Sequence, residues 1–572
     1  MPPSRPDQSI ARPGPLDEQF AALVRERFLR LMERNPVSAT HLGIHDHDHR
    51  LADAGRDAVD QELAEARSDL AAYEAIDPAG LSPESRIDRE AAVLAAKRQI
   101  FAIEEQRLWE RRGTAMDEIG DGIFLLFVRD FAPLPERLVS ITARLEQAPR
   151  VISETQTRLG ERPVRLWNEL ELRSAEEMAS LFDEVLAAAR PVWPEDSTEW
   201  RRLSGAVERA NAAIDSYQGW LREVIARGGD DVALGAERYD ELIALRAFDG
   251  LTTDEILEIG YQQLAANRNA RREMARRIDP DAPEEEVLER VKSDHPASFA
   301  EALAGYRDVM FRARQHVIDH DLATIPPGER LEVMATPDYL RNVMPFAAYF
   351  DPARFDPDPV GIYIVTPSVD DDPGAMREHN WASISNTSIH EAYPGHHLQL
   401  SAANTHPSLA RVLIDAPEFV EGWGMYCEQM MREQGFDDAP PFLLSMHTDA
   451  IWRACRIILD VRLHRGEVTP AEAIDFLVEQ TRFERPNATA EVNRYTYTPT
   501  YQLSYLLGKV MLLRLREDEQ RRLGRDFSLR AFHDSLLYAG SLPISFHRRL
   551  LAEGIVARPA GGGGPAERLA AR

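Results

Sequence analysis

A glutamate and three histidines lie close together near residue 390. The segment reads His390-Glu-Ala-Tyr-Pro-Gly-His-His397, so histidines follow the first one at six and seven residues (396 − 390 and 397 − 390). Catalytic zinc is held by three side chains drawn from His, Asp, Glu and Cys, with an open position for water. A neighbouring carboxylate such as Glu391 can accept the proton of that water. The segment therefore predicts a hydrolytic zinc site with Glu391 as general base.

The spacing differs from the helical H-E-x-x-H pattern, in which two histidines are four residues apart. On an unbroken helix, residue i+7 returns to the same face but lies about 10.5 Å further along, too far for both rings to reach one metal ion. Pro394 lacks an N–H and clashes with a carbonyl four residues back. Gly395 can adopt positive φ without steric cost. We therefore expect the helix to break between Tyr393 and His396, which brings a second histidine back toward His390.

The third ligand is expected from the segment Phe419-Val-Glu421-Gly-Trp-Gly-Met-Tyr-Cys-Glu428. A carboxylate in such an apolar setting points at a partner rather than at water, which makes Glu421 the candidate. Spacing does not decide between His396 and His397; we favour His396, with His397 supporting the ligands or contacting substrate. The predicted cofactor is one zinc ion per chain, preferred over other metals because of the His/His/Glu ligand set.

These motifs resemble the domain-of-unknown-function 885 family of predicted bacterial metallopeptidases. That family is distantly similar to the gluzincins with a long-spaced glutamate, such as angiotensin-converting enzyme, the oligopeptidases and thermostable carboxypeptidases. The His390–His397 block and Glu421-Gly-Trp carry most of the resemblance. Weaker pieces follow in the family's order: His41-Leu-Gly-Ile-His45-Asp-His47-Asp, Thr336-Pro-Asp-Tyr-Leu-Arg341, Arg494-Tyr495, Tyr505-Leu-Leu-Gly508, Phe527–Asp534 and Gly540-Ser-Leu-Pro543.

The resemblance implies a large two-lobed helical fold around a deep cleft that admits short peptides. It also implies hydrolysis of their peptide bonds. Some gluzincins carry an aspartate four residues after the glutamate ligand, where this chain has Met425. A carboxylate that supports the ligands must therefore come from elsewhere or be absent.

Peptide hydrolysis passes through an oxyanion that needs a hydrogen-bond donor. By the resemblance, Tyr505 is the first choice and Tyr501, four residues earlier on the same helical face, the second; ordinary core tyrosines are the alternative. Arg494 can bind a substrate carboxylate through two hydrogen bonds, with an ordinary ion pair as the alternative. The run Val360–Thr366, which contains Tyr363, can pair with an extended peptide substrate. A plain structural strand is the alternative there.

A second group of histidines alternates with aspartates near the N-terminus. His45, His47 and His49 flank Asp46 and Asp48. This alternation permits a second metal site if the segment is a strand. A turn of solvated and helix-capping groups is the more ordinary arrangement.

Helical periodicity dominates the elements that must position these residues. Phe20, Leu23, Val24, Phe28 and Leu31 follow one helix face that ends before Pro36. Similar patterns predict helices over Leu138–Leu159, Val207–Ile225, Thr253–Arg277 and Phe299–His320. Strands are predicted at Val360–Thr366 and Trp381–Thr387. The expected fold class is mainly α, with a small β-sheet next to the metal-binding helix.

Composition and charge limit the partners. The formal net charge of −28 disfavours nucleic acid and anionic membranes. Two cysteines, no apolar stretch within Met1–Phe20 and no run long enough to span a membrane predict a cytoplasmic protein. We divide the chain into a disordered lead-in (1–15), an N-terminal helical lobe (16–250), a catalytic zinc-binding half (251–555) and a disordered Gly-rich tail (556–572). The oligomeric state is left open.

The sequence thus predicts a zinc metallopeptidase that acts on short peptides. One alternative is a zinc hydrolase of a non-peptide amide or ester, since the same attack by water would serve. A second is a non-catalytic helical binding protein with a structural metal. A closed site with both His396 and His397 as ligands would favour that second alternative.

Overall fold

The computed structural model describes residues 14–336, 347–367 and 375–555. Residues 1–13 of the predicted lead-in, the predicted tail at 556–572 and most of Thr336–Arg341 lie outside the described residues. The described chain is mainly helical with one small sheet, which confirms the predicted fold class.

The first part of the chain consists of helices. They are α1 (Pro15–Arg34), α2 (Pro36–His41), α3 (Arg56–Glu74), α4 (Pro83–Phe101), α5 (Leu108–Arg111), α6 (Ala115–Val128), α7 (Leu134–Leu145), α8 (Ala148–Arg158), α9 (Arg165–Ala189) and α10 (Thr198–Arg227). The helix predicted over Leu138–Leu159 is therefore two helices. The break falls just before Pro149, which lies in the first turn of α8, where proline is tolerated.

The remaining helices build the part that carries the metal motif. They are α11 (Ala236–Arg246), α12 (Thr253–Ile278), α13 (Glu284–Ser293), α14 (Phe299–Asp319), α15 (Trp381–Glu391), α16 (His396–Ala403), α17 (Ala410–Leu413), α18 (Pro417–Glu433), α19 (Pro440–His464), α20 (Pro470–Thr481), α21 (Arg485–Tyr495), α22 (Ser504–Leu523), α23 (Leu529–Leu537) and α24 (Ile544–Ala552). The helices predicted over Thr253–Arg277 and Phe299–His320 are confirmed as α12 and α14.

Three strands form the sheet in the order β1-β3-β2: β1 (Leu331–Ala335), β2 (Ala347–Phe350) and β3 (Gly361–Val365). β1 pairs parallel to β3, and β2 pairs antiparallel to it. The strand predicted over Val360–Thr366 is confirmed as β3. Because β3 is hydrogen-bonded on both sides, it has no free edge for a peptide, and the predicted pairing of this strand with substrate is wrong.

The second predicted strand, Trp381–Thr387, is instead the first part of helix α15. Asn380 caps this helix, because its Oδ1 accepts a hydrogen bond of 2.9 Å from the N–H of Ser383. The helix packs on α14, α18 and α19. A capping asparagine and burial against three helices thus override the β-propensity of the segment.

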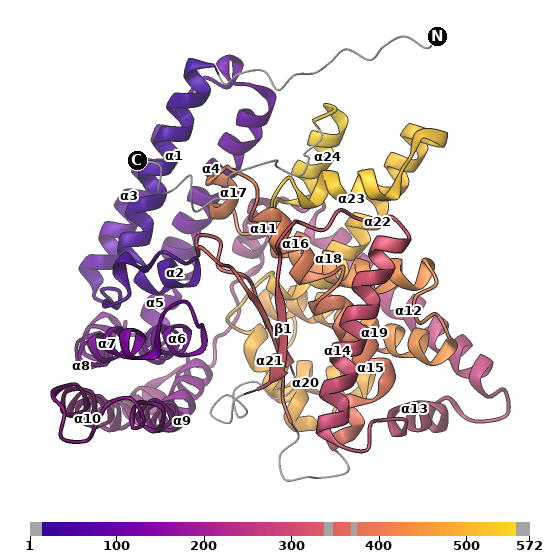
Figure 1. Cartoon of the computed structure of the whole chain (residues 1–572). Helices are drawn as coiled ribbons and strands as arrows, with labels where there is room; N and C mark the ends of the chain where they lie inside the picture. Colours follow the sequence, from indigo (N-terminus) through magenta and orange to yellow (C-terminus); the bar gives the residue numbers. More distant parts are fainter. Residues whose placement is uncertain (1–13, 337–346, 368–374, 556–572) are drawn as a thin grey trace.

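Two large hydrophobic cores lie on either side of the sheet within the described part. One joins residues between Leu51 and Leu221, and the other joins residues between Tyr239 and Leu551. Ile364 of β3 packs with Phe124 and Leu125 of α6, whereas Tyr363 and Val365 point into the second core. Figure 1 shows β1 between the N-terminal helices and the later ones. The sheet is therefore covered by a different half of the molecule on each face.

Candidate metal centre

The motif at residue 390 folds as two helices with a break between them, as predicted. α15 ends at Glu391 and α16 begins at His396, and the Tyr393–Pro394 peptide bond in the break is cis. Gly395 has φ −70°, so the break does not use the positive φ that glycine permits. Glycine is required there by space instead, because a Cβ atom on residue 395 would lie 1.9 Å from the carbonyl oxygen of His390.

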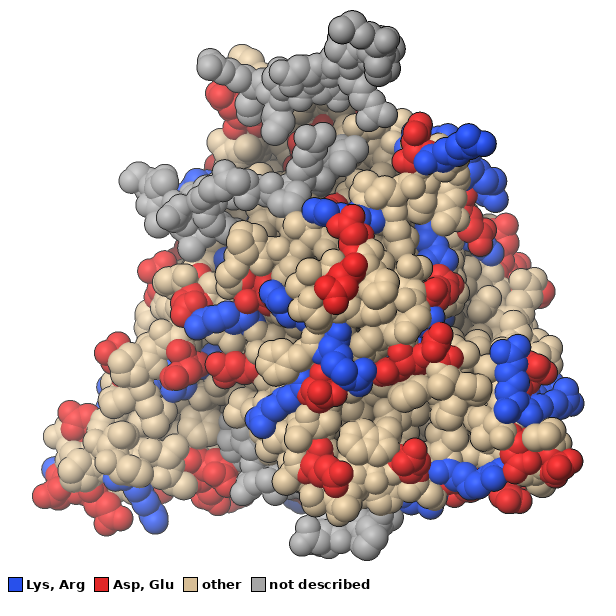
Figure 2. Space-filling view, turned by 45° about the vertical axis from the view of Figure 1, so that its right-hand side comes forward, with Lys and Arg blue, Asp and Glu red and all other residues tan. Residues whose placement is uncertain are grey.

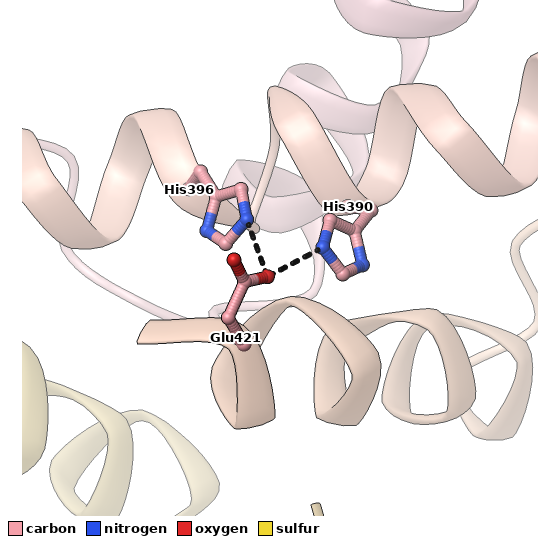
Figure 3. Close-up of side chains that lie close together, drawn as sticks. All are labelled: His390, His396 and Glu421. Atoms are coloured by element: carbon pink, nitrogen blue, oxygen red, sulfur yellow. Dashed lines mark ion pairs between the residues drawn. The ribbon is translucent and has the colours of Figure 1, made fainter. Parts of the chain in front are cut away.

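His390, His396 and Glu421 converge on one point. Their candidate ligand atoms all lie within 4.8 Å of one another. Nε2 of His396 and Nε2 of His390 lie 3.3 Å and 3.5 Å from Oε2 of Glu421, and Figure 3 shows both rings directed at this carboxylate. The three residues come from α16, α15 and α18, and each side chain is nearly buried.

These separations fit a shared metal ion. A tetrahedral ion with ligands at about 2.0–2.2 Å separates its ligand atoms by about 3.3–3.5 Å. A good N–H···O hydrogen bond would be shorter, at about 2.7–3.2 Å. The two N···O distances thus correspond to the edges of a zinc coordination polyhedron better than to hydrogen-bonded ion pairs. The donor set, two imidazoles and a carboxylate, also suits zinc.

Three residues on one face of α18 surround the ring of His390. Gly424 and Glu428 follow Glu421 by three and seven residues, so all three lie on this face. Glu421 faces Nε2, and a Cβ atom on Gly424 would lie 2.7 Å from the ring. Nδ1–H donates to Oε1 of Glu428 at 2.8 Å. With Nδ1–H donating to Glu428, Nε2 is the nitrogen that would bind a metal ion once it has lost its own proton, the usual arrangement of a carboxylate behind a ligand histidine.

Carboxylates and imidazoles in this group shift one another's pKa values. Burial by itself raises the pKa of Glu421, but His390 and His396 hold this pKa well below its ordinary value. Burial lowers the pKa of His390, yet Glu421 and Glu428 raise it to about 10. The carboxylates therefore create a negative environment around both imidazoles that favours a bound cation.

His397 lies outside the group, although it adjoins His396. Its Nε2–H donates to Glu329 at 2.8 Å, and its Nδ1 accepts from the hydroxyl of Tyr349 on β2 at 3.0 Å. Tyr393 and Arg314 also donate to Glu329. Both ring nitrogens of His397 are thus engaged, and its side chain is fully buried.

The predicted tyrosines lie beside the group. The hydroxyl of Tyr501 donates to Oε1 of Glu421 at 2.9 Å. The ring of Tyr505 is nearly parallel to that of His390, with centroids 6.5 Å apart. The centroids of the Tyr501 and Tyr505 rings are 6.0 Å apart. Burial raises the pKa of both tyrosines, so both hydroxyls stay protonated and able to donate.

The remaining predicted residues are spread more widely. Glu391 is half-buried at the end of α15, close enough to His390 and Tyr363 to influence their pKa values. Tyr363 is fully buried in the second core. Arg494 is partly exposed, 3.4 Å from Glu491, with its guanidinium 6.0 Å from the ring centroid of Tyr501.

The N-terminal histidines form a turn. His45–His47 is a short 3-10 helix in which Nδ1 of His45 lies 2.8 Å from Asp48. Its Nε2 lies 2.9 Å from Asp356, and its ring stacks on Phe131 at 3.8 Å between centroids. Over the described ranges, the one group with metal-binding geometry is His390, His396 and Glu421. His45 thus joins the N-terminal helices to the segment between β2 and β3.

Sequence reasoning missed Glu428, Glu329 and Tyr349. Glu428 could have been found, because it follows Glu421 by seven residues and so lies on the same face of a helix. Glu329 and Tyr349 meet His397 only through tertiary folding, 68 and 48 residues away along the chain.

The charged side chains on the surface do not point to a particular partner. Figure 2 shows small groups of acidic and basic side chains intermixed over the face that it draws. Among the described helices, none has the combination of length and hydropathy that crossing a membrane requires.

Comparison with known proteins defines the family. No curated protein matches the chain. Two solved structures, both of bacterial proteins described as a "putative lipoprotein", are similar over almost the whole chain. One, from Shewanella oneidensis, is 23% identical with a TM-score of 0.78 and covers 93% of this chain and 99% of its own. The other, from Colwellia psychrerythraea, is 19% identical with a TM-score of 0.82 and covers 94% and 99%.

Both likenesses show the fold alone. The sequence model of a family of bacterial proteins of unknown function, DUF885, matches residues 36–551. This match spans nearly all of the described chain and includes all three residues of the metal group. The protein therefore belongs to the DUF885 family of bacterial proteins.

Proposed function

We propose that this protein is a zinc-dependent hydrolase that cleaves peptide bonds in short peptides. The observation that carries the proposal is the convergence of His390, His396 and Glu421, with both histidine nitrogens at a distance from Oε2 of Glu421 that suits two ligands of one zinc ion. The hydrogen bond from His390 to Glu428 supports it, because such carboxylates orient ligand histidines.

The arrangement of the motif supports a hydrolytic site over a structural one. His397 would be the natural fourth ligand of a closed site, but its nitrogens are bonded to Glu329 and Tyr349. Three protein ligands leave a position for water, the pattern of catalytic zinc. The order of these residues also resembles that of the gluzincins, which hydrolyse peptides.

The protein's own groups take the following roles. His390, His396 and Glu421 hold the ion, which when bound supplies a Lewis acid that acidifies water and polarises a carbonyl. Glu391 accepts the proton of the attacking water and then donates it to the leaving amine. Tyr505, protonated and beside His390, donates a hydrogen bond to the developing oxyanion.

Zinc content per chain tests the first step. We expect about one zinc ion in the wild-type protein and a large loss in Glu421→Ala, with Glu433→Ala on the same helix as the matched control. The zinc-loaded protein is then offered short peptides beside amides and esters of similar shape. A wild-type protein that neither contains nor takes up zinc would contradict the proposal. Turnover of esters or non-peptide amides alone would show that the substrates are not peptides.

A further inference from the structure

The two oxygens of Glu421 have different neighbours. Oε2 faces both histidines of the metal group, at 3.3 Å and 3.5 Å. Oε1 accepts a hydrogen bond of 2.9 Å from the hydroxyl of Tyr501. A free carboxylate can bind a metal ion with one oxygen or with both. In this structure one oxygen is already engaged by a neutral donor.

The backbone of the preceding residue fixes the position of Tyr501. It follows Thr500, whose φ of 71° is unusual for a residue with a branched side chain. The N–H of Thr500 donates to Oδ2 of Asp460 at 2.8 Å. Such strained residues persist only when their surroundings fix them, and the bond to Asp460 supplies this restraint.

Asp460 is itself a fixed anchor. Its carboxylate is fully buried and also accepts from the hydroxyl of Tyr239 at 2.6 Å and from the amide of Gln502 at 3.3 Å. A chain of contacts thus runs from Asp460 through the backbone of Thr500 to Tyr501, and from its hydroxyl to Glu421. None of Asp460, Thr500 or Tyr501 belongs to the metal group.

We propose that Tyr501 reserves Oε1 of Glu421, so that this ligand offers a metal ion Oε2 alone, and that Asp460 positions Tyr501 by fixing Thr500. Both are positioning residues. The role assigned to Tyr501 differs from that of an oxyanion donor, which remains with Tyr505. A one-oxygen carboxylate keeps a coordination position free for water, so this inference rests on the proposed function and explains how its open position is maintained.

The spectrum of the cobalt-substituted protein tests the inference without any substrate. Four-coordinate cobalt(II) absorbs visible light more strongly than cobalt(II) of higher coordination number. In Tyr501→Phe we expect weaker absorption than in the wild type, because both oxygens of Glu421 become available. We also expect a metal dissociation constant about 10-fold to 100-fold higher.

Tyr217→Phe is the matched control. Tyr217 is also a buried tyrosine whose hydroxyl donates to a glutamate, Glu171, at 3.1 Å, but it lies in the N-terminal core. This variant should keep the wild-type spectrum and affinity. A Tyr501→Phe protein with the wild-type cobalt spectrum would overturn the role of Tyr501, whatever its affinity.

Asp460→Asn should shift the spectrum in the same direction as Tyr501→Phe. Glycine adopts positive φ without strain, so adding Thr500→Gly to Asp460→Asn should restore part of the wild-type absorption. The double variant also separates loss of positioning from loss of folding. A wild-type spectrum in Asp460→Asn would overturn the role of Asp460.

The two proposals fail in different ways. If the wild-type protein binds cobalt or zinc but cleaves no peptide, the proposed function fails, and the spectra still decide the role of Tyr501. If the wild-type protein binds no metal ion, both proposals are overturned.

Discussion

The imidazole of His390 lies against the backbone of Gly424, so that a Cβ atom on residue 424 would lie 2.7 Å from both Cε1 and Nε2 of the ring. These contacts are shorter than a carbon atom tolerates, and they involve the nitrogen that faces Glu421. Because residue 424 is glycine, the ring of His390 has the space to face Glu421.

Gly424→Ala should greatly reduce zinc binding without unfolding the protein. Alanine in a helix interior is favoured over glycine by about 1 kcal/mol, but here the added methyl group displaces the ring of His390. Zinc content and thermal stability are measured together. Gly219→Ala in α10, where a Cβ atom meets nothing within 4 Å, should leave zinc content unchanged. Full zinc occupancy in Gly424→Ala would show that the ring has room to move.

Glu428→Ala should weaken zinc binding by about 10-fold to 100-fold, because Nδ1 of His390 loses the carboxylate that orients the ring. Glu428→Gln should lose less, since its amide oxygen still accepts the hydrogen bond. Competition with a chelator measures the dissociation constants. Glu433→Ala, on the same helix but paired with Arg516, serves as the control. Equal affinities in all four proteins would contradict this role of Glu428.

Glu391→Gln should keep zinc bound but lower the rate of peptide hydrolysis by about 100-fold to 10,000-fold, the usual contribution of a general base. Glutamine is similar in size but cannot accept the proton. Zinc content and kcat are determined on the same preparation. Retained turnover at full zinc occupancy would remove Glu391 from the mechanism.

His45 should make stability depend on pH. Burial lowers its pKa, but hydrogen bonds with Asp356 and Asp48 raise it from 6.5 to about 9. The protonated ring therefore stabilises the folded protein fully below pH 6.5, and this contribution is lost as pH rises through about 9. The difference in Tm between wild type and His45→Gln should be largest near pH 6 and shrink as pH rises to 10, where only the stacking on Phe131 still separates the two proteins. The exposed His49 gives the control, His49→Gln, which should match the wild type throughout; a pH-independent difference for His45→Gln would refute the ion pair.

The parts of the site that the sequence predicts are those encoded locally. His390, Glu391 and His396 lie within one short motif, and Pro394 and Gly395 correctly predict the break between its helices. Glu421 can be predicted because a carboxylate in an apolar helix needs a partner. Sequence alone does not show why residue 395 must be glycine, because the requirement is a close backbone contact with His390 and not a positive φ.

The parts that sequence reasoning missed depend on tertiary contacts. Nothing near His397 indicates that Glu329 and Tyr349 occupy its two nitrogens, since both come from elements far away in the chain. The same holds for Trp423, whose indole N–H donates to the carbonyl of Pro394 at 2.8 Å and so ties α18 to the break. The strand predicted at Trp381–Thr387 is wrong because the Asn380 cap and burial against three helices override the local β-propensity.

The position of the sheet determines how the protein can be dissected. Ile364 is 0% exposed and packs against Phe124 and Leu125 of α6, whereas Tyr363 is covered from the opposite side. A fragment that lacked the N-terminal helices would present an apolar strand face to water and tend to self-associate. The role of the sheet is therefore better tested by single substitutions than by removing the N-terminal helices.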